Sequence, residues 1–266
     1  MGVPTAGPFD LSGTVAVVTG GTRGVGLGIA REFLAAGASV VTCSRQALDE
    51  VPAAAGLGPE ASARARHVRC DHRDADEVAD AVAATLEAFG RLDVLVNNAG
   101  GSPTADAADS SGRFFASVLA LNLVGPFVFS RAANEVMQRQ VGGGVIVNIS
   151  SLIVLTTAPG LAAYGAAKAG LNHLTRTLAV EWGPKVRVVG LGLGSMSTDS
   201  FEEYLSRQPP AARQTLVDGV GLGRLGTPAE IGRACIMVAS DGCPFINGET
   251  VYADGGSRLG APLSSP

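Results

Sequence analysis

Short apolar runs alternate with longer Ala- and Leu-rich stretches of helical spacing along nearly the whole chain. This alternation is typical of parallel strands that are joined by crossover helices. Several runs are apolar throughout, as strands covered on both faces should be. The seven predicted strands are Thr14–Thr19, Ser39–Cys43, Arg66–Cys70, Leu92–Asn97, Val145–Ser150, Val186–Leu191 and Glu249–Tyr252. Helices are predicted at 24–36, 46–54, 74–89, 110–139, 161–182 and 227–240, so we expect an α/β, doubly wound, seven-stranded parallel sheet with helices on both faces.

Residues 9–256 are predicted to form a single domain, with tails at 1–8 and 257–266. The segments 56–62 and 101–108 have the composition of loops, and both are too short to separate domains. Residues 192–226 are rich in Gly and Pro and enclose a short amphipathic piece around Phe201–Leu205. This segment is predicted to be a mobile substrate lid, although Phe201, Tyr204 and Leu205 fit the apolar side of a short helix equally well.

The composition favours a small-molecule ligand over nucleic acid. The 266 residues are 46% hydrophobic and 17% charged, with a mean hydropathy of +0.28, which is ample apolar material for a substantial core. A formal charge of −4 and a pI near 5.4 leave no broad basic surface for phosphate backbones.

The sequence predicts neither a secretion signal nor a transmembrane helix. Met1–Pro8 lacks a positively charged start and an apolar core. The apolar stretch 144–171 is interrupted by polar residues, Pro and Gly well short of a membrane span. A cytoplasmic location is therefore the expectation.

The cysteines and histidines predict no metal centre. Cys43, Cys70, Cys235 and Cys243 show neither CxxC spacing nor the density of a secreted scaffold, and we interpret them as reduced core thiols. The three histidines, at 67, 72 and 173, make no usual zinc set with these cysteines at any standard ligand spacing.

A glycine-rich turn follows the first predicted strand and leads into a helix. Its sequence, Thr19-Gly20-Gly21-Thr22-Arg23-Gly24-Val25-Gly26, has the G-x-x-x-G-x-G spacing rather than G-x-G-x-x-G. Glycines let the backbone approach a pyrophosphate, and the helix N-terminus offers it free N–H groups and partial positive charge. The turn therefore predicts a dinucleotide site, the alternative being a tight strand-to-helix connection.

The end of the second predicted strand indicates which dinucleotide binds. It lies roughly 20 residues after the glycines, where the ribose is recognised, and carries Cys43, Ser44 and Arg45 with no acidic residue. Ser44, Arg45 and Arg23 would hold a 2′-phosphate, so NADP(H) is predicted over NAD(H). The alternative is that Arg45 is merely solvated.

Tyr164 and Lys168 lie four residues apart on one predicted helix and so share a face, while Ser151 ends the strand thirteen residues before Tyr164. A neighbouring ammonium favours the anion of a phenol, so Lys168 could make Tyr164 an acid or base at neutral pH. Ser151 could then hydrogen-bond a substrate oxygen on which negative charge develops.

These motifs in this order resemble the short-chain dehydrogenase/reductase family over about residues 9–256, and in particular its 3-oxoacyl reductase-like, NADP-preferring members. The glycine turn, the run Asn97-Asn98-Ala99-Gly100, Asn122, and Ser151 with Tyr164-x-x-x-Lys168 carry the resemblance. It implies a Rossmann-like fold. It further implies that Asn122 supports a proton-relay water and that Lys168 also binds the nicotinamide ribose.

The resemblance also implies a set of cofactor contacts. Asp71 would meet the adenine with His72 beside it, and Met196 and Thr198 would approach the carboxamide and the pyrophosphate. The full predicted cofactor set is Gly20, Thr22, Arg23, Gly24, Val25, Gly26, Ser44, Arg45, Asp71, His72, Asn98, Ala99, Gly100, Tyr164, Lys168, Met196 and Thr198.

One segment departs from the family pattern. After the sixth predicted strand the family commonly has Asn-Ala-x-x-Pro-Gly, whereas this chain has Val189-Gly190-Leu191-Gly192-Leu193-Gly194. The glycines predict a looser loop and put the Met196 and Thr198 contacts in doubt. The later segments 224–230 and 254–256 match the family again.

The predicted function is NADPH-dependent hydride transfer to or from a ketone, aldehyde or secondary alcohol of an apolar substrate. Two alternatives are an NADPH-binding sensor or scaffold with little catalysis, and a lyase or epimerase on the same fold. The resemblance also implies a homo-oligomer, either a dimer or a tetramer, in which helices 110–139 and 161–182 pair across a two-fold axis.

Overall fold

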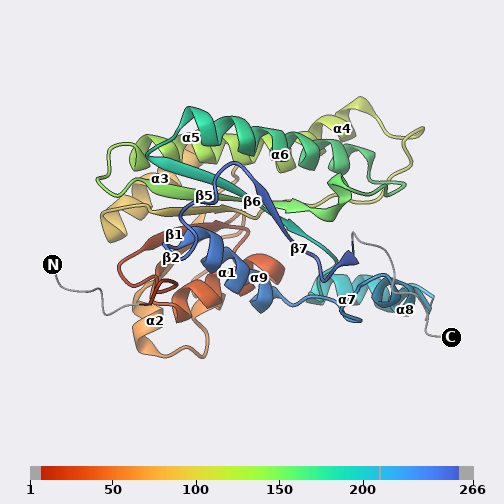
Figure 1. Ribbon diagram of the computed structural model, residues 1–266, viewed down its shortest axis with the longest axis horizontal. Coiled ribbons are helices and arrows are strands. Elements are labelled where there is room, and N and C mark those ends of the chain that lie inside the picture. Colours follow the sequence, from red (N-terminus) through yellow and green to blue (C-terminus); the bar gives the residue numbers. More distant parts are fainter. Residues whose placement is uncertain (1–6, 210, 258–266) are drawn as a thin grey trace.

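The computed structural model describes residues 7–209 and 211–257 as one parallel sheet between two layers of helices (Figure 1). The sheet has seven strands in the order β3-β2-β1-β4-β5-β6-β7, and every neighbouring pair is parallel. The strands are β1 Val15–Thr19, β2 Ser39–Ser44, β3 Ala65–Arg69, β4 Val94–Asn97, β5 Gly144–Ser151, β6 Val186–Leu193 and β7 Thr250–Ala253. The predicted doubly wound fold is confirmed.

Each face of the sheet is buried under its own set of helices, and this explains why the strands are apolar throughout. The helices are α1 Gly24–Ala35, α2 Pro59–Ala63, α3 Ala75–Phe89, α4 Gly112–Leu119, α5 Gly125–Met137, α6 Ala162–Glu181, α7 Asp199–Ser206, α8 Ala211–Asp218 and α9 Pro228–Ala239. On one face Ile29 and Phe33 of α1 pack with Ile231 of α9. On the other, Val78 of α3 and Phe129 of α5 share a core.

The strand order places a crevice at one edge of the sheet. The chain winds outward through β2 and β3 on one side of β1, and through β4 to β7 on the other. At such a switch point the loops that leave the carboxyl ends of the two central strands diverge, and ligands bind between them. Thr19 ends β1 and Asn97 ends β4, so the glycine turn and the Asn98–Gly100 run both begin there.

The predicted helix at 46–54 is wrong. Residues 45–51 have no regular structure, a 3₁₀ turn covers Pro52–Ala54, and α2 lies in the segment predicted as a loop. Pro52 and Pro59 each stand in the first turn of their helix, the position that proline tolerates because its missing N–H would be unpaired there anyway. Gly58, with a φ of +89°, is the N-cap residue that precedes α2.

The predicted helix at 110–139 is present, but it is not uniform. The α-helical turns of α4 and α5 are separated by a π-helical segment, Ala120–Val124. By length and apolar composition alone, the continuous stretch Gly112–Met137 would suffice to cross a membrane, which the sequence analysis did not anticipate. In the fold α5 lies along the sheet, with Phe129 and Ala133 buried in the core.

The predicted loose loop at Val189–Gly194 is also wrong, because β6 continues to Leu193. Gly190 pairs with Thr250 and Gly192 with Tyr252 of β7. A Cβ atom at either glycine would overlap the side chain opposite. The glycines therefore let the side chains of β7 lie over β6 and do not loosen it.

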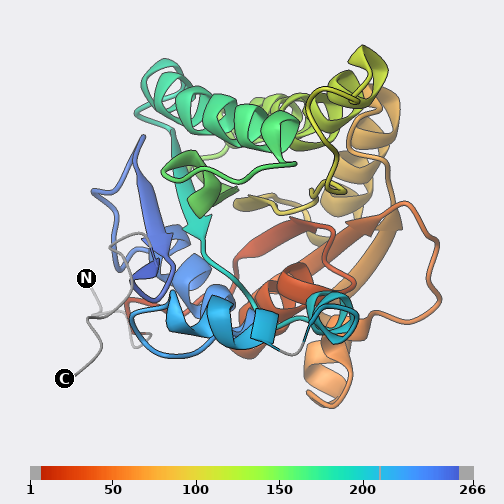
Figure 2. The same cartoon turned by 90° about the vertical axis from the view of Figure 1, so that its right-hand side faces the viewer.

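The segment predicted as a lid contains two helices, α7 and α8, which lie at the same end of the molecule as α4 (Figures 1 and 2). An isolated bridge between Met196 and Gly226 ties its two ends together. On α7, Leu205 is buried, whereas Tyr204 is exposed and stacks on Phe201. The predicted tails lie almost wholly outside the described residues.

Candidate active site

A cavity of about 920 Å³ opens at the carboxyl ends of the strands. Its volume is that of a site for a cofactor-sized ligand. Every predicted site residue except Asn122 lines it. The lining residues that sequence analysis did not assign to the site include Gln46, Arg73, Gly101, Leu121, Ile149, Ser150 and Ser200.

The glycine turn forms one wall of this cavity. A Cβ atom at Gly26 would overlap the carbonyl of Gly20 and the carboxamide of Asn98, so only glycine fits there. Arg23 is the N-cap of α1, and within the described chain its side chain makes no capping hydrogen bond. The first N–H groups of α1 therefore lack a side-chain acceptor, which is the arrangement that binds a phosphate. The cradle fits the pyrophosphate of a dinucleotide.

Thr19 joins the glycine turn to the end of β4. Its Oγ1 accepts hydrogen bonds from the backbone N–H groups of Asn98 and Ala99, both at 3.0 Å. The Asn98 Nδ2 donates back to the Thr19 carbonyl at 2.9 Å. Sequence analysis assigned no contact to Thr19. Its position at the end of β1, directly before the glycines, could have indicated that its side chain contacts the end of a neighbouring strand.

Ser44, Arg45 and Arg23 stand on the outer rim of the cavity. Ser44 is half-buried and its hydroxyl donates to the Gln46 carbonyl at 3.0 Å. Both arginines are exposed, and neither forms an ion pair with any residue in 7–209 or 211–257. Their guanidinium groups are therefore available to an anionic ligand.

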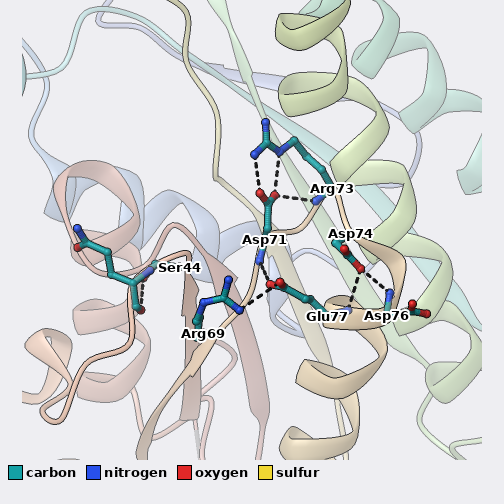
Figure 3. Close-up of polar contacts among 8 residues, drawn as sticks. Ser44, Arg69, Asp71, Arg73, Asp74, Asp76 and Glu77 are labelled. Atoms are coloured by element: carbon teal, nitrogen blue, oxygen red, sulfur yellow. Dashed lines mark hydrogen bonds and ion pairs between the residues drawn. The ribbon is translucent and has the colours of Figure 1, made fainter.

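Asp71 lies where the chain leaves β3, and its carboxylate holds Arg73 (Figure 3). The Arg73 Nε donates to Asp71 Oδ1 at 2.8 Å, and a second guanidinium nitrogen donates to Oδ2. The hydrogen bond from Arg73 holds the pKa of Asp71 down at about 2. The backbone N–H of Asp71 donates to Glu77 at 2.7 Å, and that carboxylate also pairs with Arg69. Asp71 is thus an anion in a fixed position, and Arg73 is the partner that sequence analysis missed.

Ser151, Tyr164 and Lys168 meet at the inner end of the cavity. Burial raises the pKa of Tyr164, and the nearby Ser151 hydroxyl opposes this with a smaller lowering effect. The Lys168 Nζ lies 5.7 Å from the centre of the Tyr164 ring and donates to the Ile149 carbonyl at 2.8 Å. Burial lowers the pKa of Lys168 to about 8. The net direction for Tyr164 is therefore upward, contrary to the lowering by Lys168 that the sequence analysis expected.

Asn122 lies behind this group, on the π-helical segment, and is fully buried. Its Oδ1 accepts from the Gly101 N–H at 2.8 Å, and its Nδ2 donates to the carbonyls of Gly101 and Val118, both at 2.9 Å. A Cβ atom at Gly100 would come within 2.6 Å of Asn122 Oδ1 and 3.5 Å of Lys168 Nζ. Asn122 thus stands next to the cavity without lining it.

Thr198 and Ser150 complete the walls. Thr198 caps α7 by accepting from the Phe201 N–H at 3.3 Å, and its methyl group faces Gly24 of the glycine turn. The buried Ser150 Oγ has no hydrogen-bond partner among the described residues, so it offers a polar contact to a ligand.

The four cysteines are free thiols, three buried and Cys243 half-buried, and the described residues hold no group of three or more metal-ligating side chains.

This chain is similar to known proteins over nearly its whole length. A family model described as enoyl-(acyl carrier protein) reductase matches residues 20–258. A 3alpha-hydroxysteroid dehydrogenase of Mediterraneibacter gnavus is 34% identical over 255 residues, or 93% of this chain and 98% of that protein. Galactitol 2-dehydrogenase (L-tagatose-forming) of Cereibacter sphaeroides is 36% identical over 251 residues, or 93% and 96%. The solved structure of a short chain dehydrogenase/reductase family protein matches with a TM-score of 0.82 and 38% identity, over 94% of this chain and 99% of that one.

A parallel sheet with a glycine turn at its switch point defines a nucleotide-binding α/β protein. Together with the matches over nearly the whole length, it shows that the chain belongs to the short-chain dehydrogenase/reductase family, as its motifs predicted. The chain is an oxidoreductase for alcohol and carbonyl groups, and its family uses a nicotinamide cofactor, either NAD(H) or NADP(H).

Proposed function

We propose that this chain is an NADPH-preferring reductase of ketones or aldehydes, reversible toward secondary alcohols, with Ser151, Tyr164, Lys168 and Asn122 as its working residues. The observation that supports it most is the meeting of Ser151, Tyr164 and Lys168 at the inner end of the cavity whose outer wall is the glycine turn. These groups come from β5 and α6, whereas the turn joins β1 to α1.

The side chains of the protein carry out the proton transfer to and from the substrate oxygen. When bound, the nicotinamide would supply or accept the hydride. Ser151 donates a hydrogen bond to the substrate oxygen as negative charge develops on it. Tyr164, within hydrogen-bond reach of Ser151, gives that oxygen its proton or removes it in the reverse direction. Lys168 is held by Ile149 and sets the local positive charge, and Asn122 supports a water that returns the proton to Tyr164.

The preference for NADPH rests on the exposed guanidinium groups of Arg23 and Arg45 at the rim. A 2′-phosphate would receive charge-assisted hydrogen bonds from them and from Ser44. Among the described residues that line the cavity the one acidic side chain is Asp71, which is engaged with Arg73. The sequence-based cofactor contacts of Asp71, His72, Asn98, Met196 and Thr198 are part of the same proposal, and all of these residues line the cavity.

The substrate side supports a mainly apolar carbonyl compound. Leu193 and Met196 line the cavity, and the Ile153 N–H donates to the Ser151 hydroxyl at 3.3 Å. A steroid dehydrogenase and a sugar-alcohol dehydrogenase are similarly identical in sequence to this chain. Overall similarity therefore does not select the substrate, and we assign that selection to the loops around the site. We assign the lid role to the part of the predicted segment that follows β6, from Gly194 to Gly226.

Self-association is part of the proposal. Phe115, Val124, Phe127 and Val180 are 39%, 47%, 40% and 83% exposed on α4, the π-helical segment, α5 and α6. Two such faces would cover one another in a homo-oligomer. Sedimentation of the protein at micromolar concentration tests this, and a monomer would contradict it.

The deciding experiment combines a panel of apolar ketones and aldehydes with NADPH or NADH. We expect NADPH oxidation in a 1:1 ratio with alcohol formed, and a higher kcat/KM with NADPH than with NADH. Turnover of a substrate without net NADPH oxidation would indicate a lyase or epimerase. Tight cofactor binding without turnover across the panel would indicate a sensor or scaffold, and a preference for NADH would overturn the cofactor assignment.

A further inference from the structure

The π-helical segment beside the site leaves one backbone carbonyl without a partner inside the helix. The Gly125 N–H, which in an α-helix would bond Leu121, donates to the carbonyl of Ala120. The next residue, Pro126, has no N–H to donate. The Leu121 carbonyl has therefore lost both its α-type and its π-type donor.

His72, in the turn that follows β3, supplies the missing donor. Its Nε2 lies 2.9 Å from the Leu121 carbonyl oxygen. Because a carbonyl only accepts, Nε2 carries the hydrogen. The imidazole also packs on Gly125, where any Cβ atom would overlap the ring. The contact therefore depends on both residues: Gly125 leaves the space because it has no side chain, and the His72 ring fills that space.

The surroundings keep this ring neutral. Burial lowers the pKa of His72, although the bond to Leu121 and the nearby Asp71 oppose the change. Arg73 and Lys168 also face the ring electrostatically, and both disfavour its protonation. In the neutral ring, the tautomer with hydrogen on Nε2 is the one that can donate to the Leu121 carbonyl.

The carbonyl that His72 holds belongs to the residue before Asn122. Leu121 and His72 both line the cavity, and Asn122 reaches Gly101 through hydrogen bonds in both directions. A shift of the Leu121 carbonyl would move the Asn122 side chain, because that carbonyl and the Asn122 Cα, which carries the side chain, belong to one planar peptide unit. The bond from His72 fixes that unit.

We propose that His72 is a positioning residue: by donating to the Leu121 carbonyl that Pro126 leaves unpartnered, it holds Asn122 against Gly101 beside Lys168. The inference rests on the proposed function for its effect on turnover, but its structural part is independent of that function. This role of His72 differs from a contact with the adenine of the cofactor, because the hydrogen bond is made to the backbone carbonyl of Leu121.

The test compares His72→Met, which fills the space without a donor, with His72→Gln, which keeps an N–H at similar reach. We expect His72→Met to lower kcat by about 10-fold to 100-fold, the scale on which small misplacements act, and to speed hydrogen exchange of the Gly101 amide. His72→Gln should retain most of both. Adding Pro126→Ala to His72→Met should restore both, because an alanine in place of the proline returns a backbone donor at the π-type position.

The outcomes separate the possibilities. Equal defects in His72→Met and His72→Gln, or no restoration by Pro126→Ala, would mean that the ring acts through packing alone and would overturn the proposal. In an Asn122→Ala background, His72→Met should add little, since coupled residues are non-additive. If no carbonyl substrate is turned over, the exchange of the Gly101 amide still decides the role of His72. If His72→Met does not fold alone, the His72→Met/Pro126→Ala and His72→Gln proteins give the comparison.

Discussion

At the inner end of the cavity Lys168 and Asn122 are buried and bonded to the backbone, whereas at the outer end Arg23 and Arg45 are exposed and form no ion pair with the described chain. We call Asn122, Ser151, Tyr164 and Lys168 the inner group, and Arg23, Ser44 and Arg45 the rim. The inner group is fixed by strands and helices before any ligand arrives. The rim contributes charge without fixed geometry. Substitutions should therefore change rates at the inner group and cofactor choice at the rim.

The largest expected effect is at Tyr164. Tyr164→Phe removes only the hydroxyl, so we expect a loss of kcat on the order of 10²- to 10⁴-fold, as when a general acid is removed, with little change in NADPH affinity. Tyr252→Phe is the matched control, because Tyr252 lies on β7 outside the residues that line the cavity. Steady-state kinetics and NADPH titration would measure both. A Tyr164→Phe enzyme with wild-type kcat would end the assignment of the inner group.

The next effect is a pH dependence of stability at Lys168. Its pKa is lowered to about 8 in the folded protein, from 10.5, so between these values the unfolded chain binds more protons. Stability should therefore rise with pH in that window, by roughly 2 to 3 kcal/mol relative to Lys168→Met. Urea titrations of both proteins, without cofactor, from pH 7 to pH 10.5 would measure the difference. A constant difference across the range would show that Lys168 is not desolvated.

A smaller effect is expected at the rim. Arg45→Ala removes a charge-assisted hydrogen bond to the 2′-phosphate, worth about 1.5 to 3 kcal/mol, so KM for NADPH should rise about 10-fold to 100-fold. KM for NADH and kcat should stay close to wild type. Arg91→Ala is the control, because it removes the same charge just before the amino end of β4, whereas the cavity opens at the carboxyl ends of the strands. A parallel rise in both KM values would mean that Arg45 shapes the site without reading the phosphate.

The relative positions of Ser151, Tyr164 and Lys168 could be predicted from sequence because a strand end and a helix face fix them, whereas Asn122 was expected from the family resemblance alone. Ser151 ends β5, and Tyr164 and Lys168 share a face of α6. The direction of the Tyr164 pKa could not be predicted, because it depends on how deeply the fold buries the ring. The pairing of Asp71 with Arg73 could not be predicted either, because it depends on the conformation of the turn between β3 and α3.

The fold was predictable to the extent that apolar runs and helical spacing determine it. The helix expected at 46–54 is not formed because Pro52 lies within that range and is accommodated only in the first turn of a helix. The π-helical segment Ala120–Val124 is a single turn inside a longer helical stretch, so the apolar spacing of the whole stretch still indicated one helix. The glycines of β6 suggested a loop, because the side chains that require glycine there belong to β7, 60 residues further along the chain.

Those β6 glycines also bear on the order in which the protein can be completed during synthesis. Of the seven strands, β7 is the last that the ribosome produces, and it alone brings the Thr250 and Tyr252 side chains that cover Gly190 and Gly192. Until then β6 is a sheet edge with bare backbone at two positions, beside the strand that carries Ser151. The sheet next to the active site is thus closed by one of the final segments of the described chain to be translated.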